Sequence, residues 1–113
     1  MGIKTFVNNL NRKTVNGKIQ VDNEHVRVTE YHFIPGAETK FHKHIFNYVV
    51  IPVTDGELLL INSEGEEIRS KLTRSLSYFR NSGVEHNVIN VGKKDLIFIE
   101  LEIKGNFKEK NKA

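Results

Sequence analysis

Three histidines give this 113-residue chain its clearest chemical signal. His42 and His44 stand one residue apart, and alternation along a strand would place both imidazoles on one face with Lys43 on the other. Two neutral imidazoles side by side can bind one divalent metal, whereas two protonated ones would repel each other. A single His-x-His pair is a weak signal, because surface strands carry such pairs by chance.

His86 makes the signal stronger. It follows the turn residues Asn81-Ser82-Gly83, and strands that are distant in sequence face each other across a small barrel. The chain has no cysteine, so nitrogen and oxygen atoms would hold any metal. The sequence therefore predicts a half-open metal site made by His42, His44 and His86. The alternative is a pocket that keeps its histidines and binds no metal.

Short strands must position these residues. Segments rich in β-branched, aromatic and aliphatic residues alternate with Gly, Asn and Asp turns, and no long amphipathic helix is apparent. Pro52 cannot donate a ladder hydrogen bond, so its strand should be an edge or bulged there. This pattern predicts an all-β fold, a small antiparallel sandwich or barrel. The expected strands cover residues 25–34, 40–44, 48–53, 58–61, a return strand near 68, 77–79, 84–91 and 96–103.

The length fits one domain with one core. Residues 1–20 are a polar lead-in and a candidate exchange strand in a dimer, residues 21–104 form the barrel, and residues 105–113 are a flexible basic tail. A homodimer is expected, because pairing would cover the sheet edges of a small barrel.

Composition excludes several functions. A net charge of +3 without a basic helix or aromatic platform argues against nucleic acid as a partner. No apolar run is long enough to span a membrane, and the N-terminus lacks the apolar region of a secretory signal. We therefore expect a cytoplasmic protein.

Two motifs resemble those of the cupin superfamily. In the first motif of that family, a Gly is followed by five residues and His-x-His, and here Gly36 precedes His42 and His44 with that spacing before the motif closes on Gly56. In the second, Gly83, His86 and Asn90 match the Gly, His and Asn positions, while Asn81 replaces the usual Pro and Ser75 the first Gly. The resemblance covers roughly residues 24–103 and implies a double-stranded β-helix, or jelly roll. Asn90 is expected to secure a turn.

One departure from the cupin pattern concerns the metal. The usual glutamate ligand is absent, and Tyr48 or Val49 stands in its place. The site thus resembles the three-histidine variant of some cupin dioxygenases. That resemblance implies a divalent ion, Fe(II) first, with Zn, Ni, Mn or Cu as alternatives. Because no protein carboxylate would balance the ion's charge, the partner should be a small anionic or chelating organic ligand.

Other residues are candidates for work inside the pocket. Arg27 and Tyr31 share one strand face, where Arg27 could bind a substrate carboxylate and Tyr31 could donate a proton, unless that face is the outer one. Tyr48 is a third catalytic candidate, with barrel core as its alternative. Glu100 and Glu102 would be outer partners of the metal histidines or would be solvated, and we expect at least one to be solvated.

The chain is also similar to a group of small bacterial cupins, some of which are named for β-alanine degradation. The residues that carry this likeness lie at 48–56 and 83–90. Together these features predict a metal-binding cupin that acts as a small, dioxygenase-like enzyme on a small organic or amino acid. The alternative is a non-catalytic binding or sensor cupin.

Overall fold

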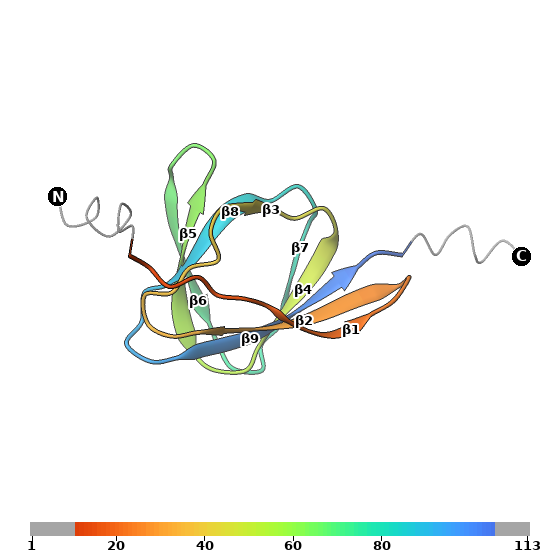
Figure 1. The fold of residues 1–113 in the computed structure, drawn as a ribbon, viewed down its shortest axis with the longest axis horizontal. Helices are drawn as coiled ribbons and strands as arrows, with labels where there is room; N and C mark the ends of the chain where they lie inside the picture. The colour runs from red at the N-terminus through yellow and green to blue at the C-terminus, as the bar shows by residue number, and fades with distance from the viewer. Residues whose placement is uncertain (1–10, 106–113) are drawn as a thin grey trace, which may run out of the picture.

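The computed structural model describes residues 11–105, and all of its regular structure is β (Figure 1). Within these residues there is no helix of the length and apolarity that crossing a membrane requires. The nine strands are β1 (Lys18–Asp22), β2 (Val26–Phe33), β3 (His42–Lys43), β4 (Asn47–Pro52), β5 (Gly56–Asn62), β6 (Glu67–Leu72), β7 (Tyr78–Arg80), β8 (Glu85–Asn90) and β9 (Leu96–Ile103). Residues 1–10 and 106–113, which include parts of the expected lead-in and tail, lie outside the described range.

The strands form two sheets that face each other (Figure 1). One sheet has the order β1-β2-β9-β4-β7 and the other the order β3-β8-β5-β6, and every pairing between these strands is antiparallel. The expected all-β barrel is therefore observed. The segment expected at residues 40–44 forms only the two-residue strand β3.

Pro52 shows how the sheet accommodates a residue without an N–H. β4 lies inside its sheet, between β9 and β7, but β7 pairs only with Tyr48, Val49 and Val50. Pro52 lies beyond the end of that pairing and is locally at an edge, as the missing donor requires. Its carbonyl oxygen accepts a hydrogen bond from the N–H of Ser75 (3.0 Å).

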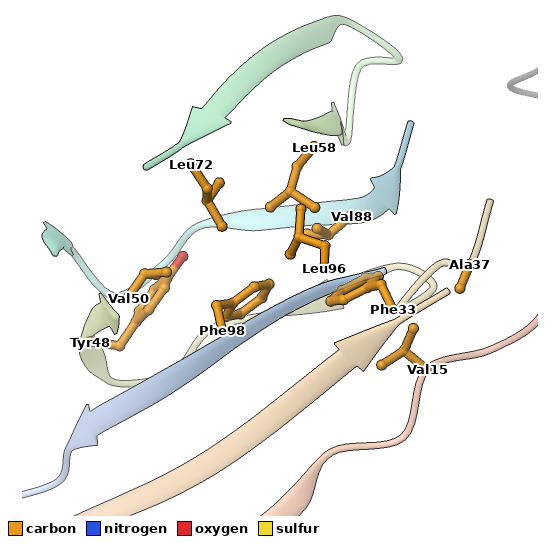
Figure 2. Close-up of a cluster of buried hydrophobic side chains, with 10 residues drawn as sticks. All are labelled: Val15, Phe33, Ala37, Tyr48, Val50, Leu58, Leu72, Val88, Leu96 and Phe98. Carbon is orange, nitrogen blue, oxygen red and sulfur yellow. The ribbon is translucent and has the colours of Figure 1, made fainter. Parts of the chain in front are cut away.

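The apolar core fills one end of the space between the sheets. Phe33 and Leu96 are completely buried there. Figure 2 shows side chains from both sheets pointing toward one another, with Phe98 between Tyr48 and Phe33. The rings of Phe33 and Phe98 stack with centroids 5.5 Å apart. This packing anchors the closed end of the lumen and leaves the other end for polar residues.

The N-terminal segment 11–17 runs across the space between the sheets (Figure 1). The N–H of Val15 donates to the carbonyl of Glu38, and the N–H of Glu38 donates to the carbonyl of Lys13. Gly17 then passes so close to β2 that a Cβ there would stand 2.5 Å from the Thr29 side chain and 2.9 Å from the ring of Tyr31. Glycine at this position therefore lets the segment cover the lumen beside Tyr31.

Part of the lumen face of the five-stranded sheet is polar, although its other part is apolar core. On β9 the residues that are buried toward the lumen include Glu100 and Glu102, while Ile99 and Leu101 lie on the partly covered outer face. Leu101 is in register with Val28 on one side and Val49 on the other, and Val49 is in register with Phe79. An apolar row thus crosses four strands on the outside of this sheet.

β6 forms one edge of the smaller sheet. It alternates charged residues with Ile68, Ser70 and Leu72, and it pairs with β5 on its inner side only. Arg69 forms an ion pair with Glu57 across the two strands (3.6 Å). The charged residues of this edge strand are Glu67, Arg69 and Lys71.

Candidate metal centre

The three predicted histidines come together in the structure. His42 on β3 stands directly opposite His86 on β8 in the antiparallel ladder. His44 follows β3 and is fixed by two backbone bonds, one from its N–H to the carbonyl of Val84 (2.8 Å) and one from the N–H of Gly83 to its own carbonyl (2.7 Å). Gly83 has a φ of 94°, which a glycine adopts without strain. The turn before β8 therefore positions both His44 and His86.

The ring nitrogens of these histidines converge on one point. Nε2 of His44 lies 3.1 Å from Nε2 of His42 and 3.2 Å from Nε2 of His86. The ligand atoms of all three residues lie within 4.8 Å of one another. Nitrogens bound to one shared ion at 2.0–2.1 Å would stand roughly 2.8–3.4 Å apart. The donor set thus fits a single divalent metal ion, and the group could hold one.

His42 is oriented by the turn that precedes it. Its Nδ1–H donates to the carbonyl oxygen of Lys40 (2.9 Å), and Oγ1 of Thr39 lies 3.2 Å from the same nitrogen. This bond places the proton on Nδ1 and leaves the Nε2 lone pair directed at the other histidines. Lys40 has a φ of 74°, a conformation that is unfavourable for a residue with a side chain. That strained turn puts the Lys40 carbonyl where His42 needs an acceptor.

Burial keeps the other two histidines neutral. Desolvation, followed by the nearby charge of His42, lowers the pKa of His44 to about 4 and that of His86 to about 3. His44 is 6% exposed and His86 9%. Both rings therefore present a lone pair at neutral pH, which is the form that binds a metal. Tyr48 stacks on His44 with ring centroids 4.0 Å apart and holds that ring in place.

His42 and His44 line a cavity bounded by the five-stranded sheet, and His86 lines a small recess. One part has a volume of about 400 Å³ and lies between the histidines and the lumen face of β2 and β9. A second part of about 250 Å³ extends past His42 toward Val88 and Phe98 under the N-terminal segment. The lining residues that matter below are Arg27, Tyr31, Glu100 and Glu102.

The catalytic candidates all lie near this cavity, and their roles remain predictions. Arg27 and Tyr31 face the lumen and not the outside. Arg27 is already paired, because its Nε and Nη2 donate to the two carboxylate oxygens of Glu102 (2.7 and 3.3 Å). Burial, followed by the charge of Glu100, raises the pKa of Tyr31 to about 12. Burial also raises the pKa of Tyr48, which is both a core residue and the ring against His44.

The two glutamates of β9 are the residues that sequence reasoning misjudged. We expected at least one of them to be solvated, but Glu100 and Glu102 are each only 8% exposed. Burial, followed by the charge of Glu102, raises the pKa of Glu100 to about 8. The residues beside them, Ile99, Leu101 and Ile103, make the opposite face of this strand the more apolar one. The shared face with Leu96 and Phe98 was the signal that could have corrected this reading.

Asn90 has the structural role expected of it. Its Nδ2 donates to the carbonyls of Phe33 (3.2 Å) and Lys94 (2.9 Å), and its Oδ1 accepts from the N–H of Gly92 (2.9 Å). The side chain is 1% exposed and ties the turn after β8 to the end of β2. It therefore supports the strand that carries His86.

Comparisons with known proteins agree with this fold. No family model matches the sequence. The β-alanine degradation protein BauB of Pseudomonas aeruginosa is 52% identical over 86 residues, which cover 76% of this chain and 90% of that protein. The crystal structure of a cupin domain from Bordetella pertussis superposes with a TM-score of 0.81 at 49% identity, covering 85% of this chain and 99% of that one.

A more distant structure shows the same fold. A protein with a double-stranded β-helix domain from Klebsiella pneumoniae has a TM-score of 0.67 at 20% identity, covering 94% of this chain and 90% of that one. The jelly-roll architecture expected from the two histidine motifs is thus confirmed. The chain belongs to the cupin superfamily, in the group of small bacterial cupins that includes BauB.

Proposed function

We propose that His42, His44 and His86 bind one divalent metal ion, Fe(II) first among the candidates, and that the chain is a small dioxygenase-like enzyme acting on a small organic or amino acid. One observation supports the metal site above all others. Three imidazole Nε2 atoms, with neighbouring pairs 3.1 and 3.2 Å apart, converge where His42 and His44 line a cavity and His86 lines a small recess. Without an ion, two facing Nε2 atoms could stabilise each other only by one hydrogen bond, in which one of the two nitrogens carries the proton.

A divalent ion on three neutral ligands would supply Lewis acidity and open coordination positions for a chelating acid and for O2. The chain's own residues shape what reaches it. The Arg27–Glu102 ion pair has no net charge. The negative charge of an incoming acid would therefore be balanced by the metal ion and not by Arg27. The phenol of Tyr31 stays protonated at neutral pH, because its pKa is about 12, and can donate a hydrogen bond.

The size of the cavity and the relatives support a small substrate. A volume of about 400 Å³ is at the lower end of small-molecule pockets. The relative BauB is named for β-alanine degradation, and β-alanine is a small amino acid with one carboxylate. Both facts favour a compact carboxylic or amino acid over a sugar nucleotide or a polymer.

Metal analysis of the purified protein tests the site. We expect close to one divalent ion per wild-type chain and almost none in His86→Ala, because a two-histidine remnant binds far more weakly. His32→Ala is the matched control, since His32 is exposed and bonded to Asp95 outside the cavity. Full metal content in His86→Ala, or equal losses in both variants, would show that the three histidines are not the ligands.

Turnover tests the second half of the proposal. Iron-loaded protein should consume one or more members of a panel of keto, hydroxy and amino acids, and the oxygen electrode should show whether O2 is used. If metal binds stoichiometrically but no acid in the panel is consumed, with or without oxygen, the non-catalytic binding cupin is the better description.

A further inference from the structure

Glu100 is a buried carboxyl group that the proposed metal chemistry leaves unused. It lies on β9, in register with Thr29 on one side and Val50 on the other. The residue is 8% exposed, and it lines the cavity together with His42. Among residues 11–105, Glu100 has neither a hydrogen bond nor an ion pair. A polar group in such a position calls for a partner.

The nearest cation is not free to be that partner. Arg27 binds both carboxylate oxygens of Glu102 with its Nε and Nη2. Two carboxyl groups and one guanidinium therefore share this part of the lumen, and the pairing leaves Glu100 as the surplus acid. The charge of Arg27 would compensate ionised Glu100 only in part, because Arg27 is bound to Glu102, and the ionised form is unfavourable until a second cation arrives.

The walls around Glu100 suit an organic cation. Tyr31 and Phe98 line the same part of the cavity, and their rings contact each other with centroids 5.5 Å apart. Tyr48 and Glu100 also line a small recess together with His86. The faces of aromatic rings attract ammonium groups, and a carboxylate adds a charge-assisted hydrogen bond. A carboxylate among phenol and phenyl rings is thus a compact receptor for an alkylammonium ion.

The histidine group and Glu100 lie on opposite sheets. The histidines come from β3, β8 and the β3–β4 connection, whereas Glu100 comes from β9 in the facing sheet. We propose that Glu100 receives the ammonium group of a small amino acid whose carboxylate meets the metal held by His42, His44 and His86. This inference rests on the proposed metal site, and it narrows the ligand from organic acids in general to zwitterions.

A pair of isosteric ligands tests this assignment. β-Alanine and butyrate have the same chain length and carboxylate, and they differ in an ammonium or a methyl group at the far end. We expect the cobalt(II)-loaded wild-type protein to bind β-alanine about 10- to 100-fold more tightly than butyrate, as measured by the visible spectrum and by calorimetry. In Glu100→Gln the two affinities should become nearly equal. Glu30→Gln is the matched control, because Glu30 lies one residue from Thr29 on the outer face of the same sheet.

Each outcome decides something different. If the wild-type protein binds β-alanine no more tightly than butyrate, the ammonium site is refuted and no variant is needed to show it. An equal loss of affinity for both ligands in Glu100→Gln also overturns it, because Glu100 would then serve the metal alone. A wild-type chain that takes up no metal refutes the proposed function itself, and the inference falls with it. A preference kept by Glu30→Gln and lost by Glu100→Gln supports the proposal.

Discussion

The unpaired Glu100 should make the stability of the metal-free protein depend on pH in an unusual direction. An unfolded chain releases this proton near the ordinary glutamate pKa of 4.5, whereas the folded protein keeps it until about pH 8. Between these values the folded state holds one more proton than the unfolded state, so stability falls as pH rises. The substitution Glu100→Gln removes this proton equilibrium while it keeps the shape of the side chain.

The expected size follows from the width of that interval. At 1.36 kcal/mol per pH unit, the interval from 4.5 to about 8 corresponds to about 5 kcal/mol. The part of that interval between pH 5 and pH 8 corresponds to at most about 4 kcal/mol, and water that enters the cavity when Glu100 ionises would reduce it, so we expect about 2 to 4 kcal/mol. Glu100→Gln should therefore gain that much stability over the wild-type protein on going from pH 5 to pH 8.

Urea denaturation at intervals from pH 5 to pH 9, with metal removed by a chelator, measures the effect. Subtracting the wild-type curve from that of the variant cancels the other titrating groups, including Asp22, whose pKa is lowered by its hydrogen bond to Lys104. Glu30→Gln should follow the wild-type curve. Parallel curves for the wild-type protein and Glu100→Gln would refute the reasoning, because Glu100 would then be ionised and satisfied in the folded state.

Two further predictions concern the scaffold. Asn90→Ala should lower the free energy of unfolding by about 3 kcal/mol, because two carbonyls and the Gly92 N–H lose their partner. Urea denaturation measures this change, and a loss below about 1 kcal/mol would contradict the prediction. We also expect the homodimer to form through the apolar row that includes Leu101 and Phe79, so sedimentation should give twice the chain mass for the wild-type protein and the single mass for Leu101→Glu. A monomeric wild-type chain at all concentrations would contradict it.

Much of the fold could be predicted because local sequence carries it. The alternating run that ends at Pro35-Gly36 became β2, and the apolar run 96–103 became β9. The metal histidines could also be predicted from the sequence, because the spacing of two motifs specified them before any contact was known. The direct pairing of His42 with His86 could not be predicted, because it joins residues 44 positions apart and depends on the register of the whole barrel.

The lumen wall was harder to predict for a physical reason. Alternation tells which residues share a face, but it does not say which face is inside when the lumen is itself polar. On β9 the hydrophobic pattern favoured Ile99 and Leu101 as the buried residues, and the opposite set with Glu100 is the one that lines the cavity. The partner of Arg27 was missed for the same reason, since Glu102 belongs to that set.

The charged edge strand β6 has a consequence for how copies of this protein meet in a crowded solution. An open strand edge offers unpaired N–H and C=O groups to any extended chain, and that template starts edge-to-edge sheet growth. Glu67, Arg69 and Lys71 place a charged side chain at every second position of this edge strand, so another strand could add there only by desolvating them. Aggregation by strand addition is thereby opposed at β6, and the chain can carry a broad apolar sheet face without also offering that edge as a nucleus for fibrils.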